Sequence, residues 1–250
     1  MTKISGIFAA SMSVLNSDMS LNIEKTIKHA EKLILMGEVK VNGNKILTPA
    51  FFVSKNDKIT IKNEMLQSST KTKLFIFHKP KGVIVSKNDP QKRKTIYDFL
   101  PTNMQQFHYV GRLDYNTEGL LLLTNNGKLK RHLELPINKI ERNYKVKIYG
   151  NIKNLNKKQL SKGVTIKNIK YGPIYIDVLE NKEKISWLSI KIYEGKNREI
   201  RKIMEYYDLL INDLIRIQFG PFHLRNLKRG ELISIEEKEL NFFMRSIGEL

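Results

Sequence analysis

Residues 111–127 read GRLDYNTEGLLLLTNNG, and this stretch decides the fold of the larger part of the chain. The apolar run Leu120–Thr124 predicts a buried strand, which the Asn-Asn-Gly after it ends. A short strand at His108–Val110 comes first, so the polar residues between the two strands form a loop against the core. A carboxylate there, at Asp114 or Glu118, must be solvated, hydrogen-bonded or paired with a cation. The spacing alone is also explained by a simple turn, because Asp-x-Asn-Thr is favourable turn chemistry.

Outward from this stretch, strand patterns dominate the sequence. Strands and helices follow one another without a regular βαβ rhythm, which predicts an α+β fold with a mixed, mostly antiparallel sheet. A helix is expected to begin after Asn197, as its N-cap, and to run to about Tyr207. Further elements are expected as a short helix at residues 95–100 and as strands at residues 73–77, 144–148, 188–192 and 215–219.

The first 65 residues have a different pattern, which predicts two helices and a small sheet. One helix is expected at residues 4–15. The second is clearer, because apolar residues are spaced four, three and four apart from Ile23 to Ile34 and Gly37 follows as a stop signal. Alternating residues then lead into Asn42-Gly43, a strong hairpin signal.

A polar stretch of small residues, Gln67–Thr72, is the expected linker, so we predict domains at residues 1–66 and 73–250. The formal net charge of the 250 residues is +19, from 44 Lys and Arg against 25 Asp and Glu. Residues 1–70 hold 9 Lys, no Arg and 6 acidic residues, which leaves 35 basic and 19 acidic residues for the remainder. The larger part is therefore strongly basic. A polyanion such as nucleic acid is the partner that this charge favours, although a biased lysine-rich composition also explains it.

Several classes of chemistry lack their sequence signals. Without cysteine there is no disulfide, thiolate or iron–sulfur chemistry, and no Cys-based zinc site. The five histidines are scattered, and neither the phosphate-binding nor the dinucleotide-binding glycine motif occurs. We therefore expect no metal and no nucleotide cofactor. No apolar run is long enough for a membrane span and no signal-peptide pattern is present, so a cytoplasmic location is expected.

The pattern GRLDxxTxGLLLLTN resembles the signature of ribosomal-RNA pseudouridine synthases of the Rsu/Rlu branch. The resemblance covers about residues 73–236, and it continues in four other blocks. The N-terminal part, around Ala30–Ile34 and Gly37–Gly43, is similar to an S4-type RNA-binding domain. It departs from that pattern at Ser20–Glu24, where family members usually have Ser-Arg-Arg. The four blocks of the larger part are Phe75–Val83, Glu141–Val146, Glu194–Met204 and Leu214–Pro221.

The resemblance implies that a uridine within RNA is isomerised to pseudouridine, a reaction that needs no cosubstrate. It assigns Asp114 as the essential carboxylate, which attacks the anomeric carbon or removes a sugar proton to give a glycal. It gives Tyr144 a place against the extruded base, where its hydroxyl can take part in proton transfer. It gives Arg201 the role of pairing with the Asp114 carboxylate in a dry pocket.

The resemblance also implies ribosomal RNA, or a pre-ribosomal particle, as the partner of a monomeric enzyme. A looped or single-stranded uridine is the expected target because it costs least to extrude. Large-subunit RNA is expected, and small-subunit RNA is the alternative. Residues expected to contact the RNA are Arg112, Lys79, Lys81, Lys92, Arg93, Lys94 and Arg198.

Two other readings of the sequence stay open at this point. A non-catalytic RNA-binding factor for ribosome assembly would have the same charge and the same two-part layout. A nucleic-acid hydrolase would use Asp114 and Glu118 as paired carboxylates, although these lie four residues apart on a loop.

Overall fold

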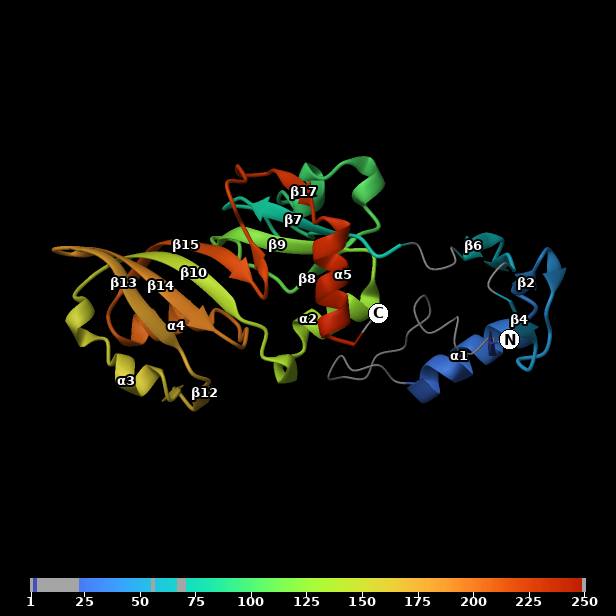
Figure 1. Ribbon diagram of the computed structural model, residues 1–250, viewed down its shortest axis with the longest axis horizontal. Coiled ribbons are helices and arrows are strands. Elements are labelled where there is room, and N and C mark those ends of the chain that lie inside the picture. The colour runs from blue at the N-terminus through green and yellow to red at the C-terminus, as the bar shows by residue number, and fades with distance from the viewer. Residues whose placement is uncertain (1, 4–22, 55–56, 67–70, 249–250) are drawn as a thin grey trace. The chain divides into compact units, whose positions relative to one another are not determined.

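The computed structural model describes residues 2–3, 23–54, 57–66 and 71–248, which form two compact units, Met1–Thr72 and Lys73–Leu250 (Figure 1). The helix expected at residues 4–15 and residues 67–70 of the expected linker lie outside the described residues.

The first unit pairs one helix with small antiparallel sheets. Helix α1 ends in a Schellman motif, in which the Glu38 N–H donates to the Leu33 carbonyl (3.1 Å) and Gly37 has a φ of 69°. The core beneath the helix contains Ala30 and Ile34, and the expected hairpin is confirmed by strands β2 and β3. The elements are β1 (Thr2–Lys3), α1 (Ile23–Leu35), β2 (Val39–Val41), β3 (Asn44–Lys45), β4 (Phe52–Val53), β5 (Ile59–Ile61) and β6 (Glu64–Leu66).

A nine-stranded mixed sheet forms the second unit, with the path β13-β14-β10-β15-β9-β7-β17 and with β8 and β16 paired to β9 and β15 (Figure 1). All pairs are antiparallel except β15 with β9, which confirms the expected α+β fold. Its strands are β7 (Leu74–Lys79), β8 (His108–Val110), β9 (Glu118–Thr124), β10 (Arg142–Tyr149), β13 (Tyr175–Lys182), β14 (Ile185–Ile192), β15 (Leu210–Phe219), β16 (Phe222–His223) and β17 (Leu232–Ser234).

Helices and a separate hairpin complete the second unit. Helix α4 contacts β15, and α2 contacts β8 and β9. The expected N-cap Asn197 is wrong: α4 begins at Glu199, and the N-cap is Arg198, in left-handed conformation with a φ of 52°. The elements are η2 (Ile96–Phe99), η3 (Thr102–Met104), α2 (Gly127–Glu134), η4 (Pro136–Asn138), η5 (Ile152–Asn154), α3 (Lys157–Leu160), β11 (Val164–Ile166), β12 (Ile169–Tyr171), α4 (Glu199–Tyr206) and α5 (Glu237–Ser246).

The four leucines of β9 are buried on both faces of the sheet. Leu121 and Leu123 belong to the cluster that includes Met204 of α4, whereas Leu120 and Leu122 belong to the cluster that includes helices α2 and α5. A strand with two covered faces needs continuous rather than alternating apolar residues, which explains the run of leucines. The loop before β9 is thereby anchored to the interior of the second unit's sheet.

Candidate active site

The loop between β8 and β9 contains Asp114 and leads directly into the centre of the sheet. Where it enters β9, Gly119 pairs with Arg216 of β15. Gly119 has a φ of 114°, and a Cβ added there would lie 2.3 Å from the Arg216 carbonyl oxygen. Only glycine allows this close approach. The two parallel strands are thus brought together beside the loop, and the Thr117 N–H closes the loop by donating to the Asp114 carbonyl (3.0 Å).

A buried lysine, Lys79, bonds to the backbone of the loop that contains Asp114. The Lys79 side chain is fully buried at the end of β7, and its ammonium donates to the carbonyls of Thr117 (2.8 Å), Pro80 (2.9 Å) and Tyr115 (3.4 Å). Burial lowers the pKa of Lys79 to about 8, against the opposing effect of Asp114 and Glu118. Lys79 therefore cannot contact RNA as expected from the sequence. Strand alternation was the available signal, because Phe75, Phe77 and Lys79 occupy alternate positions on β7.

Asp114 is half-buried, and its carboxylate has no hydrogen-bond donor among the residues that the structure describes. Two cations act on it electrostatically. Its charge raises the pKa of Lys79 and of Arg201, in both cases against the larger lowering effect of burial. The carboxylate therefore lies in a positive field while its oxygens remain available to a ligand.

Arg201 reaches the loop from α4. Its Nη2 donates to the Asn116 carbonyl (2.9 Å) and lies 3.4 Å from the Thr117 hydroxyl. Its Nε is buried and has no partner among the described residues. Burial and Arg198 lower the pKa of Arg201, and Asp114 opposes that change. The structure thus brings Arg201 and Asp114 to one loop. The family resemblance implies a pair between the Arg201 guanidinium and the Asp114 carboxylate, but the guanidinium bonds to the loop backbone instead.

Tyr144, the expected aromatic residue, lies on β10 directly opposite Arg216 of β15. Both side chains are buried. Arg216 donates from Nε to the Leu120 carbonyl (2.7 Å), and its Nη2 has no partner within the described part of the chain. Burial lowers the pKa of Arg216, and the adjacent Tyr144 opposes this shift.

Sequence analysis did not single out Arg216. The alternation of Ile215, Ile217 and Phe219 places its side chain on the other strand face, and the sequence gives no signal that this face is also buried. A buried cation with a free donor beside Tyr144 is therefore a feature that only the structure reveals.

Glu118 does not form a carboxylate pair with Asp114. Its Oε1 accepts from Arg229 Nε (2.9 Å) and lies 3.1 Å from His78 Nε2, and the side chain is buried in β9. The other His78 nitrogen lies 2.7 Å from the Leu227 carbonyl. Glu118 thus holds neighbouring segments together. This arrangement argues against the hydrolase reading, which requires two free acids.

An acidic pair, Glu194 and Glu199, lies at the start of α4. Glu199 is buried, and its Oε2 accepts from the Lys196 N–H (3.1 Å), while Glu194 accepts from the Gly172 N–H (2.8 Å) and from Lys196 Nζ (2.6 Å). Burial, together with the neighbouring Glu194, raises the pKa of Glu199. The Glu199 carboxyl is therefore protonated where an ordinary glutamate is ionised, and the pair joins the segment before Arg201 to the turn at Gly172.

The other residues expected to contact RNA are exposed. Arg112, Lys92, Lys94 and Arg198 face solvent. Lys81 forms an ion pair with Asp213, and Arg93 forms one with Asp89. Among the described residues, no group of His, Asp and Glu side chains could hold a metal ion. Nor does any described helix have the length and apolar character needed to cross a bilayer.

Comparison with known proteins identifies the family. The family model for RNA pseudouridylate synthase matches residues 73–206, and the model for the S4 domain matches residues 19–59. An "uncharacterized RNA pseudouridine synthase" of Rickettsia felis is 44% identical over 213 residues, which cover 85% of this chain and 92% of the relative. The ribosomal large subunit pseudouridine synthase B of Buchnera aphidicola (subspecies Acyrthosiphon pisum) is 36% identical over 239 residues, covering 89% and 96%.

A solved crystal structure of a pseudouridylate synthase shares the fold, with a TM-score of 0.63 at 24% identity, and the match covers 86% of this chain and 92% of that one. These matches and the geometry around Asp114 lead to one conclusion: the chain belongs to the RNA pseudouridylate synthase family and has an S4 domain before its synthase domain.

Proposed function

We propose that this protein isomerises one uridine of large-subunit ribosomal RNA to pseudouridine, with Asp114 as its essential carboxylate. The observation that supports this role is the Asp114 carboxylate itself: half-buried, near two cations, and free of hydrogen-bond donors in the described chain. The large subunit is the substrate named for relatives from Buchnera aphidicola, at 36% identity, and Yersinia pestis, at 32%.

The reaction breaks the bond between N1 of uracil and C1′ of the ribose, rotates the base, and forms a bond from C5 to C1′. The proton on C5 is then lost and N1 gains one, so that no atom enters or leaves overall. Asp114 either attacks C1′ or removes a sugar proton, and both routes need an ionised carboxylate near the anomeric carbon. Lys79 and Arg201 hold the backbone of the loop that carries this carboxylate.

Tyr144 and Arg216 supply the remaining groups in this proposal. An aromatic ring can pack against a base that has left its stack, and a hydroxyl can relay the proton that C5 loses. The unpartnered Nη2 of Arg216 beside Tyr144 is a donor for a carbonyl oxygen of the rotating base or for the Tyr144 oxygen. We further propose that the enzyme acts as a cytoplasmic monomer and without a nucleotide cofactor.

Pseudouridine mapping across both ribosomal RNAs tests the function and the target together. Cells that lack the gene should lose one pseudouridine in the large-subunit RNA. The wild-type gene should restore it, and Asp114→Asn should not. If no site is lost, the protein is a binding factor rather than an enzyme. If the lost site is in the small-subunit RNA, the target proposed here is wrong.

A further inference from the structure

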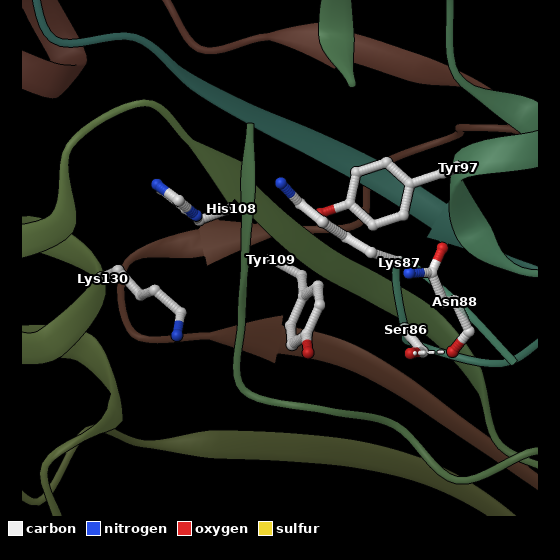
Figure 2. A pocket seen from close by; sticks show the side chains of 7 residues that line it. All are labelled: Ser86, Lys87, Asn88, Tyr97, His108, Tyr109 and Lys130. Atoms are coloured by element: carbon white, nitrogen blue, oxygen red, sulfur yellow. Dashed lines mark hydrogen bonds between the residues drawn. The ribbon is translucent and has the colours of Figure 1, made fainter. Parts of the chain in front are cut away.

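A second basic site lies at the opposite end of β9 from the Asp114 loop. Residues of loop 86–88, Tyr97, His108, Tyr109 and Lys130 line a cavity of about 370 Å³ (Figure 2). His108 pairs with Thr124, the last residue of β9, whereas the Asp114 loop joins β9 at its first residue. At about 3.3 Å per residue, six residues of strand separate the two places by roughly 20 Å.

The cavity gathers cations beside aromatic rings. The Lys87 ammonium lies 5.9 Å from the centre of the Tyr97 ring, and the Lys130 ammonium lies 5.7 Å from the centre of the Tyr109 ring. Both lysines and both rings are drawn in Figure 2, in which the two lysines come from different segments of the chain.

One carboxylate counters this charge. Glu134 lies 3.3 Å from Lys130 Nζ, and its other oxygen accepts from the Gly111 N–H (2.7 Å). Lys87 has no carboxylate partner among the described residues. The cavity therefore has an excess of positive charge that an anion would balance.

The pKa of His108 reflects this excess of positive charge. Burial lowers its pKa, and Lys87 and Lys130 lower it further, while Glu134 opposes them. The Tyr97 hydroxyl is occupied because it donates to the Phe107 carbonyl (2.7 Å). The pKa of His108 therefore lies below its ordinary value in the free protein, and an anion placed between the two lysines would raise it.

We propose that this cavity binds a backbone phosphate and the adjacent base of the substrate RNA, a few nucleotides from the target uridine. Two ammonium groups suit a phosphate, and the half-buried Tyr109 ring offers a face on which a base of any sequence can stack. The distance of roughly 20 Å from the Asp114 loop allows one RNA strand to reach both places. The inference rests on the proposed function in so far as RNA is the substrate.

The salt dependence of RNA binding tests the phosphate contact without requiring catalysis. The probe is a single-stranded oligouridylate of about a dozen nucleotides, and affinity is measured at several salt concentrations. Lys87→Met and Lys130→Met should each reduce the slope of log affinity against log salt, and the Lys87→Met/Lys130→Met double variant should reduce it by about 0.7, the value for one lost phosphate contact on a single strand. Lys128→Met removes the same charge from the same helix as Lys130 but outside the cavity, and should leave the slope unchanged.

Proton NMR titration of His108 supplies a second, local readout. Adding the oligouridylate should raise the pKa of His108, and the increase should vanish in the Lys87→Met/Lys130→Met double variant. Polyglutamate, titrated in parallel at matched charge concentration, should not reproduce the shift.

The outcomes separate this inference from the proposed function. A reduced slope and a His108 shift in an enzyme that makes no pseudouridine would support the subsite and contradict the function. A normal slope in both single variants, or bound RNA without a His108 shift, would overturn the subsite even if pseudouridine forms. A shift with polyglutamate but not with RNA would assign the cavity to an acidic protein segment and also overturn the inference.

Discussion

Replacing Lys79 by methionine tests whether the Asp114 loop depends on the buried Lys79 side chain for its position. Methionine has a similar length and is apolar, so it can occupy the fully buried site without a large change of volume. The carbonyls of Pro80, Tyr115 and Thr117 lose their shared donor, and the backbone around Asp114 becomes free to move. We expect a large loss of activity with only a small loss of stability.

Two opposing terms set the change in stability. The two short bonds from the Lys79 ammonium, at 2.8 and 2.9 Å, stabilise by about 1.5–3 kcal/mol each. Burial opposes them, since the fall in pKa from 10.5 to about 8 corresponds to about 3 kcal/mol against the charged form. The difference predicts that Lys79→Met lowers the free energy of unfolding by about 0–3 kcal/mol. A loop displaced by about 1 Å can lose about a hundredfold in turnover.

Single-turnover pseudouridine formation and urea unfolding measure the two effects in the same preparation. Lys81→Met is the matched control, because it removes the same charge two residues later from an exposed side chain. That variant should raise KM and leave kcat close to the wild-type value. If Lys79→Met turns over at the wild-type rate, or if it fails to bind RNA although folded, the Lys79 side chain does not position the loop and the reasoning is wrong.

Three further substitutions test the surrounding geometry. Gly119→Ala should destabilise the fold by more than about 3 kcal/mol in urea unfolding, because its Cβ would lie 2.3 Å from the Arg216 oxygen, whereas Gly127→Ala, with open space around it, should be tolerated. Glu199→Gln should flatten the pH dependence of stability: the raised pKa means that the folded state retains a proton that the unfolded state loses, so wild-type stability falls as pH rises above about 4.5. A steep slope that persists in Glu199→Gln would show that another group titrates. Arg201→Lys should reduce kcat by about ten- to a hundredfold with an unchanged circular dichroism spectrum, because lysine keeps the charge but lacks the planar guanidinium that donates to the Asn116 carbonyl. Wild-type turnover would contradict this role.

Local sequence patterns predicted the strands and the hairpin because those elements depend on neighbouring residues. The leucine run gave β9, alternation gave β10 and β14, and Asn42-Gly43 gave the β2–β3 turn. The start of α4 was missed by one residue, since Arg198 adopts a left-handed conformation that a basic side chain seldom signals.

The partners of the buried charges could not be predicted in the same way. Alternation with Phe75 and Phe77 is a signal for the burial of Lys79, whereas no such signal marks Arg216, and a charged residue on a strand usually faces solvent. Their partners are backbone carbonyls distant in sequence: the Lys79 ammonium bonds to Thr117, and Arg216 bonds to Leu120. Carbonyls carry no sequence signal, so these contacts emerge only when the sheet is assembled.

The family resemblance supplied candidates, and the structure placed them. Asp114, Tyr144 and Arg201 come from three separate segments, and their roles remain predictions. The contact that the resemblance suggested, between Arg201 and the Asp114 carboxylate, is replaced by a bond to the Asn116 carbonyl. From this difference we predict that Arg201 positions the loop, while the Asp114 carboxylate stays available to the substrate.

The most direct test of the central claim is single-turnover conversion of a large-subunit RNA fragment by wild-type protein and by Asp114→Asn, with RNA affinity measured on the same samples. The account predicts that the variant binds the RNA within a few fold of wild type and forms no detectable pseudouridine. Pseudouridine formation by Asp114→Asn at the wild-type rate would contradict the claim that this carboxylate performs the chemistry.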